Sequence, residues 1–407
     1  MNYDFKQAEK FLVPQFEAIN DIRDFNQRKV LNAFIENKVA PEHFYTVSGY
    51  GHDDLGREVL DKTFADVFKA EKALVRVHFA SGTHTLACAL FGNLRPNDKL
   101  ISVAGTPYDT MREVIGTAGD EETKRSSLIG YGIKYDEVPL LNETDIDFET
   151  LEKMVDKETT MVLIQRSKGY STRKSLTIDT IERICKTVKS KNPECICFVD
   201  NCYGEFVEDR EPTEVGADLM AGSLIKNPGG GIVEAGGYIT GKALYVDRAA
   251  NRLTAPGVGS EGGAMFNQHR LMFQGLFMAP SIVSEAVKGA VLAAKVFEDI
   301  GYNSYPKYDD KRTDIIQNII FGKPEPLEQF CRTIQSLSPI NGYVTPIPEH
   351  IPGYEDEVIM AGGTFIEGST IELSADGPMR EPYVAYLQGG LNYAHIKICL
   401  EDMVKKL

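Results

Sequence analysis

The stretch that decides the fold is Gly222-Ser-Leu-Ile-Lys-Asn-Pro-Gly-Gly-Gly231. It overlaps the end of an apolar segment, Leu219–Ser223, that is typical of a buried strand, and it places Lys226 just after that strand. The three glycines allow a bulky ligand to approach the backbone. We expect a lysine that is desolvated at a strand end to have a lowered pKa, which favours the neutral, nucleophilic amine. The alternative is a lysine exposed to water in a loop, which is the usual state of lysines.

Two upstream motifs carry matching chemistry. The apolar run Cys195-Ile-Cys-Phe-Val-Asp-Asn201 ends on Asp200, a carboxylate that is costly to bury unless it is paired or hydrogen-bonded. The turn Ala80-Ser-Gly-Thr-His-Thr85 follows another apolar run and opens a helix. There the backbone N–H groups and the hydroxyls of Ser81 and Thr83 can hold a phosphate. A plain helix cap at Ser81 and a hydrogen-bonded acid at Asp200 are the alternatives for each motif alone.

Together, a lysine, a buried acid and a phosphate-binding turn in this order predict a site for pyridoxal 5'-phosphate. The lysine forms a Schiff base with the aldehyde, the acid keeps the pyridine nitrogen protonated, and the turn binds the phosphate. Ser223, three residues before Lys226, can add a hydroxyl to the phosphate site.

The surrounding sequence predicts an α/β domain. Strand-like apolar runs alternate with helical or glycine-rich segments between residues 72 and 275, and this alternation indicates a mainly parallel sheet covered on both faces. The expected strands are Lys72–Phe79, Lys99–Val103, Ile133–Val138, Thr160–Gln165, Ile196–Asp200, Leu219–Ser223 and Gly236–Thr240. The expected helices between them are 83–92, 107–117, 147–155, 178–191 and 242–253. In such sheets ligands bind beyond the carboxyl ends of the strands, where all three candidate groups lie.

Outside this region, apolar spacing of three to four residues predicts helices over 6–37 and 58–70. The apolar stretch from Met265 to Ile300 predicts either one long helix or two helices broken near Pro280. We therefore expect a helical arm over 1–47, a large cofactor-binding domain over 48–289 and a smaller C-terminal α+β domain over 290–407.

Composition excludes several classes of protein. The chain has 407 residues, 43% hydrophobic and 25% charged, with a formal net charge of −15, so we expect neither a nucleic acid nor an anionic membrane as partner. The first residues lack the apolar core of a secretory signal, and no run approaches the roughly 20 apolar residues of a membrane helix. Seven dispersed cysteines and seven dispersed histidines favour reduced thiols in a cytoplasmic protein without a metal site.

Longer motifs make the chain similar to a known family. It resembles the pyridoxal-phosphate enzymes of cysteine and methionine metabolism, and within them the methionine gamma-lyase-related family known as aluminium resistance proteins. The matching stretches, which span most of the chain, are Ser48-Gly-Tyr-Gly-His-Asp-Asp-Leu-Gly-Arg57, Ser81-Gly-Thr-His84, Gln165-Arg-Ser-Lys-Gly-Tyr170, Val199-Asp-Asn-Cys-Tyr-Gly-Glu-Phe206, Gly222–Gly231, Glu372-Leu-Ser-Ala-Asp-Gly-Pro378 and Gln388-Gly-Gly-Leu391.

The resemblance implies an aspartate-aminotransferase-like fold (fold type I of these enzymes) and a role for each matched residue. Lys226 is then the Schiff-base lysine and Asp200 the partner of the pyridine nitrogen. Tyr108 stacks on the cofactor, although a mobile surface tyrosine is the alternative. The residues implied to hold the phosphate within the same chain are Ser81, Gly82, Thr83 and Ser223.

Other implied roles concern the partner subunit and the substrate. Tyr50 and Arg57 resemble a pair that reaches the neighbouring subunit's phosphate, which implies a homodimer or homotetramer with shared sites; a solvated arginine in a loop is the alternative. Arg380 is our choice for binding the substrate carboxylate, with Arg166 and Arg173 as rivals. The sequence departs from the well-studied lyases in its Ser-Leu-Ile-Lys226 context and in lacking their C-terminal arginine signature.

The expected function is therefore carbon–sulfur bond cleavage in a sulfur amino acid, by β- or γ-elimination of a thiol. Lys226 serves as the base at the α-carbon, and Tyr108 or Lys226 protonates the leaving sulfur. Two alternatives stay open. One is another reaction of the same cofactor, of the aminotransferase, racemase or aldolase type. The other is a stress protein that binds the cofactor without turnover.

Overall fold

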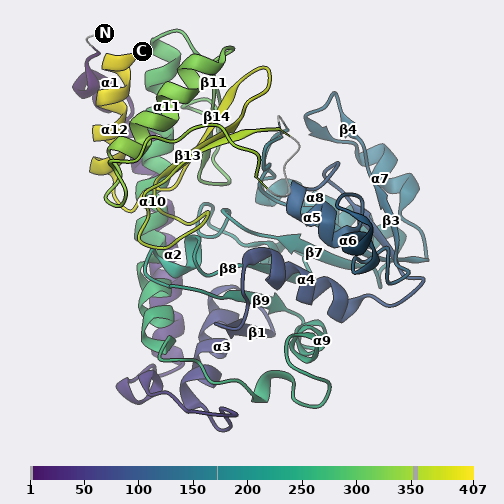
Figure 1. Cartoon of the computed structure of the whole chain (residues 1–407). Coiled ribbons are helices and arrows are strands. Elements are labelled where there is room, and N and C mark those ends of the chain that lie inside the picture. The colour runs from purple at the N-terminus through teal and green to yellow at the C-terminus, as the bar shows by residue number, and fades with distance from the viewer. Residues whose placement is uncertain (1–2, 172, 352–355) are drawn as a thin grey trace.

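The computed structural model describes residues 3–171, 173–351 and 356–407, which fold around two separate sheets (Figure 1). The larger sheet has seven strands in the order β1-β9-β8-β7-β6-β2-β3. Their bounds are β1 Lys72–Arg76, β2 Lys99–Ser102, β3 Lys134–Glu137, β6 Thr159–Gln165, β7 Ile196–Asp200, β8 Leu219–Ser223 and β9 Gly237–Gly241. Each of them overlaps one of the seven strands expected from the sequence.

The large sheet is mainly parallel, as predicted. The neighbours β8, β7, β6, β2 and β3 pair in parallel, whereas β9 runs antiparallel to both β8 and β1. The carboxyl ends of β6, β7 and β8 therefore lie at one edge of the sheet, and they end on Gln165, Asp200 and Ser223.

Both faces of the large sheet are covered, which explains why its central strands are apolar throughout. All five residues of β7 are buried: Cys197 and Val199 join the core on one face, and Ile196 and Phe198 join the core on the other. The first core is formed with α2 (Val13–Glu36), α3 (Leu55–Val67), α8 (Ile178–Lys191) and α10 (His269–Asp299). The second is formed with α4 (Gly82–Asn93), α5 (Asp109–Ile115) and α9 (Ala243–Leu253).

The helix α10 links the two halves of the molecule (Figure 1). It is one continuous helix of 31 residues that includes Pro280, which decides between the one-helix and two-helix expectations. By length and apolar composition α10 could cross a membrane, but 67% of its most apolar window is buried inside the protein. Its residues contribute to both the large and the small core, so packing accounts for its apolar character.

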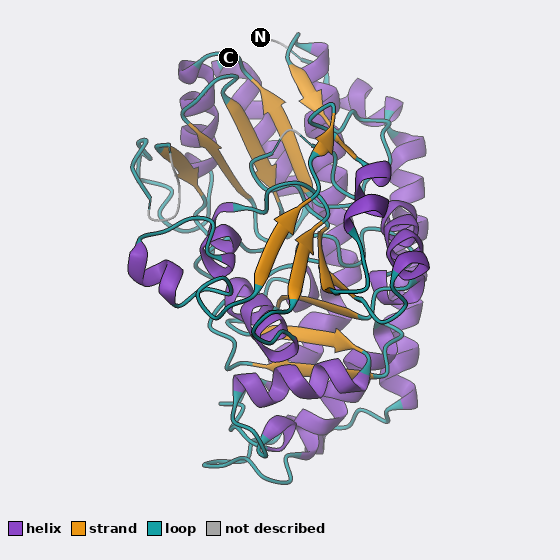
Figure 2. Ribbon diagram, turned by 90° about the vertical axis from the view of Figure 1, so that its right-hand side faces the viewer, coloured by secondary structure: helices purple, strands orange, loops and turns teal. Residues whose placement is uncertain are grey.

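The small sheet is antiparallel, with the order β10-β11-β14-β13-β12. Figure 2 shows the two groups of strands one above the other, with a column of helices beside them. The bounds of its strands are β10 Asn303–Tyr305, β11 Ile316–Ile320, β12 Val358–Ala361, β13 Ser374–Pro378 and β14 Val384–Gln388. Its core also takes residues from α1 (Phe5–Phe11), α11 (Pro324–Ser336) and α12 (Tyr393–Lys406).

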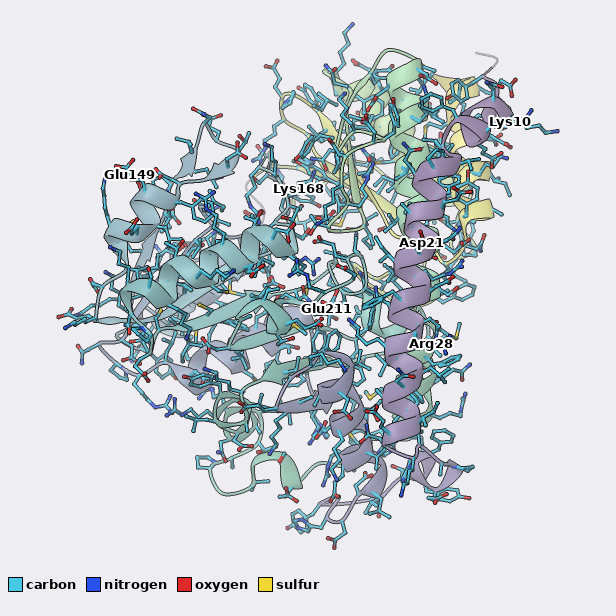
Figure 3. All side chains as sticks on the ribbon, turned by 180° about the vertical axis from the view of Figure 1, so that it is seen from behind. Lys10, Asp21, Arg28, Glu149, Lys168 and Glu211 are labelled. Atoms are coloured by element: carbon cyan, nitrogen blue, oxygen red, sulfur yellow. The ribbon has the colours of Figure 1, made fainter. Side chains whose placement is uncertain are left out.

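The N-terminal arm contacts both cores. Phe5 and Ala8 of α1 pack in the small core, while Val30 and Ala33 of α2 pack in the large one. Figure 3 shows α1 and α2 running along the height of the molecule past Lys10, Asp21 and Arg28. The arm therefore packs against both halves of the molecule.

Shorter elements complete the described chain. The helices are α6 (Glu121–Arg125) and α7 (Phe148–Met154), and a two-stranded ribbon pairs β4 (Leu140–Leu141) with β5 (Asp145–Ile146). The 3-10 turns are η1 (Pro41–Phe44), η2 (Pro212–Val215), η3 (Asn227–Gly229) and η4 (Gly259–Glu261). All seven cysteines are unpaired, and six of them are buried.

Candidate active site

The three strand ends of the large sheet open into one cavity of about 450 Å³. Gln165, Asp200 and Ser223 line it from β6, β7 and β8. The N-terminal turn of α4 and the loop that carries Lys226 add further walls, and the small sheet closes the cavity through Asp376, Tyr386 and Gln388. A cavity of this size at the carboxyl ends of parallel strands is a typical ligand site of such folds.

Lys226 is held by two oxygen acceptors inside this cavity. Its Nζ donates hydrogen bonds to the Tyr203 hydroxyl at 2.6 Å and to the Ser369 carbonyl at 2.7 Å. It also lies 3.8 Å from the centre of the Tyr203 ring. The two acceptors come from different halves of the molecule, so they fix the direction of the amine between the large and small domains.

The expected lowering of the Lys226 pKa is wrong for this structure. Burial, the largest influence, does lower the pKa, as the sequence argument assumed. Contacts with Tyr203 and the nearby Cys202 and Asp200 outweigh burial and raise the pKa above its ordinary value. The sequence argument counted the desolvation of the strand end and left out these partners.

Asp200 is the last residue of β7 and only 5% exposed. Its Oδ1 accepts a hydrogen bond from the Cys202 backbone N–H at 3.1 Å. Burial raises the pKa of this carboxyl, although the contacts with Cys202 and the charges of Lys226 and Arg173 oppose part of the rise. A carboxyl that is costly to ionise where it stands fits a cationic partner such as a protonated pyridine nitrogen.

The turn at 80–85 forms the expected helix N-terminus. Ser81 caps α4, and its hydroxyl oxygen accepts the His84 N–H at 3.1 Å, so the capping alternative is also realised. A Cβ added to Gly82 would lie 3.3 Å from the Ser223 Cβ, so the helix N-terminus and the end of β8 meet closely. The backbone N–H groups and the hydroxyls of Ser81, Thr83 and Ser223 thus face one corner of the cavity, which fits a phosphate.

Tyr108 lies in the cavity, half-buried, and caps α5. Its backbone N–H donates to Gln165 Oε1 at 3.0 Å, and its hydroxyl hydrogen-bonds the side chains of Thr83 and Thr110. Burial, with Asp200 and Cys202 nearby, raises the pKa of Tyr108 well above its ordinary value. The geometry therefore places Tyr108 beside Asp200 and the phosphate corner rather than on the surface.

Tyr50 and Arg57 lie away from the cavity of their own chain. Tyr50 is 82% exposed. The Arg57 guanidinium is buried and donates to the carbonyls of Gly51, Glu261 and Gly263 at 2.6, 2.9 and 3.2 Å. A contribution of this pair to a partner subunit's site stays a prediction.

The three candidate arginines for the substrate carboxylate lie outside the main cavity. Arg166 is fully buried and pairs with Glu208 at 3.1 Å and Glu211 at 3.7 Å. Arg173 donates to three backbone carbonyls, those of Gln165, Ser167 and Lys174. Arg380 pairs with Asp356 at 2.7 Å and lines a small neighbouring cavity that shares Asp109 and Tyr170 with the main one.

Arg166 and its neighbours lie at the junction of the two domains. Arg166 Nε donates to Thr313 at 3.3 Å, and the neighbouring Ser167 donates to Asp314 at 2.9 Å. Lys168, which is labelled with Glu211 in Figure 3, reaches the Tyr305 carbonyl at 3.4 Å. The Gln165–Tyr170 motif therefore anchors the end of β6 to the small domain.

Several cavity residues were missed by the sequence reasoning. Tyr203 and Ser369 hold Lys226, and Asp376 and Tyr386 reach the cavity from neighbouring strands of the small sheet. Two of them lie in matched motifs, Tyr203 in Val199–Phe206 and Asp376 in Glu372–Pro378, whereas Ser369 and Tyr386 lie outside every matched stretch. Membership in these motifs does not predict that either residue lies near Lys226.

Comparisons with known proteins agree with this geometry. A model of the family described as methionine gamma-lyase matches residues 1–407. A curated relative, the uncharacterised protein YnbB of Bacillus subtilis (strain 168), is 49% identical over 391 residues, 96% of this chain and 92% of its own length.

Solved structures place the same fold in both near and distant proteins. A Listeria monocytogenes protein, named as a candidate cystathionine beta-lyase involved in aluminium resistance, superposes with a TM-score of 0.96 at 48% identity, covering 99% of this chain and 98% of its own. The pyridoxal-5'-phosphate-dependent protein YhfS of Escherichia coli has a TM-score of 0.62 at 16% identity, covering 96% and 97%.

These likenesses confirm the predicted aspartate-aminotransferase-like fold, and the family and its neighbours imply pyridoxal phosphate as the cofactor. Because the family model matches the whole length and the curated relative is 49% identical over 96% of this chain, this chain belongs to the methionine gamma-lyase family.

Proposed function

We propose that this protein is a pyridoxal-phosphate-dependent carbon–sulfur lyase that acts on a sulfur amino acid and releases a thiol, ammonia and a keto acid. One observation carries the proposal: Lys226, Asp200 and the N-terminus of α4 border a single cavity at the carboxyl ends of β6–β8. The family and the name of the Listeria relative support an elimination of the cystathionine beta-lyase or methionine gamma-lyase type.

The residues present fit the cofactor. The α4 N-terminus with Ser81, Gly82, Thr83 and Ser223 would hold the phosphate, and Asp200 would hold the proton of the pyridine nitrogen. Tyr108 would lie against the ring. When bound, pyridoxal phosphate supplies an electron sink for the negative charge that develops at the substrate α-carbon.

Lys226 would bind the cofactor and then move the α-proton. Its Nζ is held between the Tyr203 hydroxyl and the Ser369 carbonyl, so the amine is aimed into the cavity between the domains. As the free amine it takes the proton from the α-carbon. Asp200 balances the positive charge at the other end of the site.

The leaving sulfur needs a proton, and Tyr108 or Lys226 can supply it. The raised pKa of Tyr108 keeps its hydroxyl protonated near neutral pH. In the overall balance, the α-proton goes to Lys226, the carbon–sulfur bond breaks with its electron pair on sulfur, and the sulfur takes up a proton. One water is consumed when ammonia and the keto acid form.

The test is product analysis with the purified protein supplied with pyridoxal phosphate. Cystathionine, methionine and cysteine are offered separately, and thiol, ammonia and keto acid are quantified. Release of all three in equal amounts supports the lyase. Transfer of the amino group to an added keto acid, or no turnover with any sulfur amino acid, overturns it. The matched control is Lys226→Ala, which should lose both turnover and the visible absorbance of the bound cofactor.

A further inference from the structure

The cavity carries an unusual charge balance for a protein that binds amino acids. Lys226 is its only basic lining residue among the described parts of the chain, and the lining carboxylates are Asp109, Asp200, Glu367 and Asp376. Every arginine of the sequence lies within the described residues, and none lines this cavity. With Asp200 assigned to the pyridine nitrogen, the substrate side of the cavity is acidic.

Asp376 is the carboxylate on that side that lies on the small sheet, half-buried and outside any ion pair among the described residues. Within the described residues, no lysine, arginine or histidine nitrogen lies within 4.0 Å of it. Tyr170 hydrogen-bonds its side chain, and the charge of Lys226 reaches it from across the cavity. Burial raises the pKa of Asp376 to about 7, despite these two opposing contacts. Asp376 is half-buried, and a carboxyl that is partly removed from water without a cationic partner is costly to ionise; such groups are common where a ligand supplies the partner.

Two aromatic rings frame this carboxyl. Asp376 and Tyr386 are directly opposite each other in the β13–β14 ladder, so their side chains share the face that looks toward the large domain. The ring of Tyr386 lies 4.9 Å from that of Tyr170, tilted by 48°. All three residues line the cavity. A carboxylate beside aromatic rings is a setting that attracts ammonium groups through charge and cation–π contacts.

We propose that Asp376, framed by Tyr170 and Tyr386, binds an ammonium group carried by the leaving thiol of the substrate. The inference rests on the proposed lyase activity, in which the α-amino group of the substrate is already engaged at the Lys226 end. The preferred substrate class is therefore a thioether amino acid with a second amino group beyond the sulfur. A substrate with an uncharged S-alkyl end leaves Asp376 without a partner.

The rival role for Asp376 is that of a proton donor to the leaving sulfur. The two roles make different demands on the substrate. A proton donor serves every leaving thiol alike, whereas an ammonium site distinguishes thiols by charge. Substrates of equal length that differ only at the terminal atom therefore separate them.

The experiment uses two pairs of compounds with the cofactor-loaded protein. Kinetics compare S-(2-aminoethyl)cysteine with S-propylcysteine, which differ only in a terminal ammonium or methyl group. Calorimetry compares L-lysine with L-2-aminoheptanoate, which have the same end groups but no carbon–sulfur bond to cleave. Each pair is measured with the wild type, Asp376→Asn and Glu367→Gln, the last of which removes a negative charge from the exposed rim of the same cavity.

We expect the wild type to have at least about tenfold higher kcat/KM for the ammonium thioether and at least about tenfold higher affinity for L-lysine, each relative to its methyl-ended counterpart. This factor corresponds to one charge-assisted hydrogen bond. Asp376→Asn should abolish that preference and leave the affinity for 2-aminoheptanoate unchanged, which also shows that the variant is folded. Glu367→Gln should keep the preference. The assignment is overturned if the wild type does not prefer the ammonium compounds, or if Asp376→Asn weakens the binding of both compounds of a pair equally. It is also overturned if Glu367→Gln removes the preference as completely as Asp376→Asn does.

The two proposals fail separately. If the protein prefers L-lysine through Asp376 but cleaves neither thioether, the lyase proposal is contradicted and the ammonium-site proposal stands. If the protein cleaves both thioethers with equal kcat/KM and does not prefer L-lysine, the lyase proposal stands and the ammonium-site proposal is contradicted.

Discussion

At the scale of single residues, the site depends on what burial does to two carboxyls at opposite ends of one cavity. Asp200 terminates β7 and Asp376 lies on β13, and burial raises the pKa of both. Each is expected to gain a cation only when a ligand is bound: the pyridinium for Asp200 and a substrate ammonium for Asp376. Their roles can therefore be tested one at a time.

Asp200→Asn should separate cofactor binding from turnover. Asparagine has nearly the same shape but cannot balance the charge of a protonated pyridine nitrogen, so the electron sink is lost. We expect turnover to fall by about 100-fold or more, the usual size of a lost electrostatic contact in an active site. The cofactor should stay bound through Lys226 and the α4 N-terminus. The measurement is kcat beside a titration of bound cofactor by its visible absorbance; unchanged kcat would contradict the role.

The carboxyl of Asp376 should leave a signature in the pH dependence of folding stability. Its pKa is raised from 3.8 to about 7 in the folded protein, so between these values the folded state holds a proton that the unfolded chain has released. Stability contributed by this group is therefore present at low pH and is lost as the pH rises through about 7. The titratable groups around it are Lys226, Tyr170, Tyr386 and the thiol of Cys331.

Asp376→Asn should remove this part of the pH dependence. Measured by urea unfolding from pH 4 to pH 8 without substrate, the variant should lose less stability across that range. At pH 8 it should be more stable than the wild type, with an upper limit of about 4 kcal/mol. A variant whose stability curve runs parallel to that of the wild type would show that Asp376 titrates normally.

At the scale of elements, the loop that carries Lys226 is seated on α10 by glycines. A Cβ added to Gly275 of α10 would lie 2.3 Å from the Gly229 carbonyl oxygen, and one added to Gly230 would lie 2.5 Å from the Gly275 carbonyl oxygen. The turn η3 and the helix thus touch backbone to backbone. Any residue larger than glycine at this crossing has to push the Lys226 loop away from the helix.

Gly275→Ala should therefore destabilise the protein although alanine favours helices by nearly 1 kcal/mol over glycine. We expect a net loss of about 1–3 kcal/mol in unfolding free energy, from overpacking, together with weaker cofactor binding. Ser281→Ala, at an exposed position of the same helix, is the control and should change neither quantity. The checks are urea unfolding and cofactor titration. A more stable Gly275→Ala variant would mean that the crossing is loose.

The elements of the large domain were predictable because each carries local information. The central strands of its sheet are apolar runs bounded by polar or glycine-rich turns, and the sequence places Asp200 and Ser223 at strand ends where the structure has them. The sequence did not predict that Asp376 and Lys226 line the same cavity. This placement depends on the β13–β14 register and on how the small sheet packs against the large one, which no local pattern contains. The pKa of Lys226 was misjudged for the same reason, because Tyr203 lies 23 positions away in the sequence.

In the molecule as a whole, Tyr50 lies on a surface away from the cavity of its own chain. The loop that bears Tyr50 is tied to the loop before α10 by the hydrogen bond from Gly263 N–H to the Tyr50 carbonyl, at 2.8 Å. Tyr50, Val258 and Phe266 on these loops are exposed apolar side chains, 82%, 42% and 65% accessible. Exposed apolar side chains on these two loops suit contact with a second copy of the chain, and we propose that Tyr50 completes the partner's phosphate site there. Arg57 is buried and holds the Tyr50 loop through its hydrogen bonds to the carbonyls of Gly51, Glu261 and Gly263.

Subunit mixing tests this proposal directly. Tyr50→Ala removes an exposed side chain, so each subunit should keep its stability, while Lys226→Ala removes the lysine from the cavity of its own chain. Each variant alone should be nearly inactive. If Tyr50 acts in the partner's site, a mixed dimer contains one site with both residues, so unfolding and refolding the two variants together in equal amounts should restore roughly a quarter of wild-type activity. Activity no higher than the sum of the separate variants would place Tyr50 with Lys226 of its own chain or outside the site altogether. Gradual loss of wild-type activity on dilution, in step with dissociation measured by light scattering, should accompany the restored activity because a lone subunit lacks the contacts to the phosphate that its partner supplies.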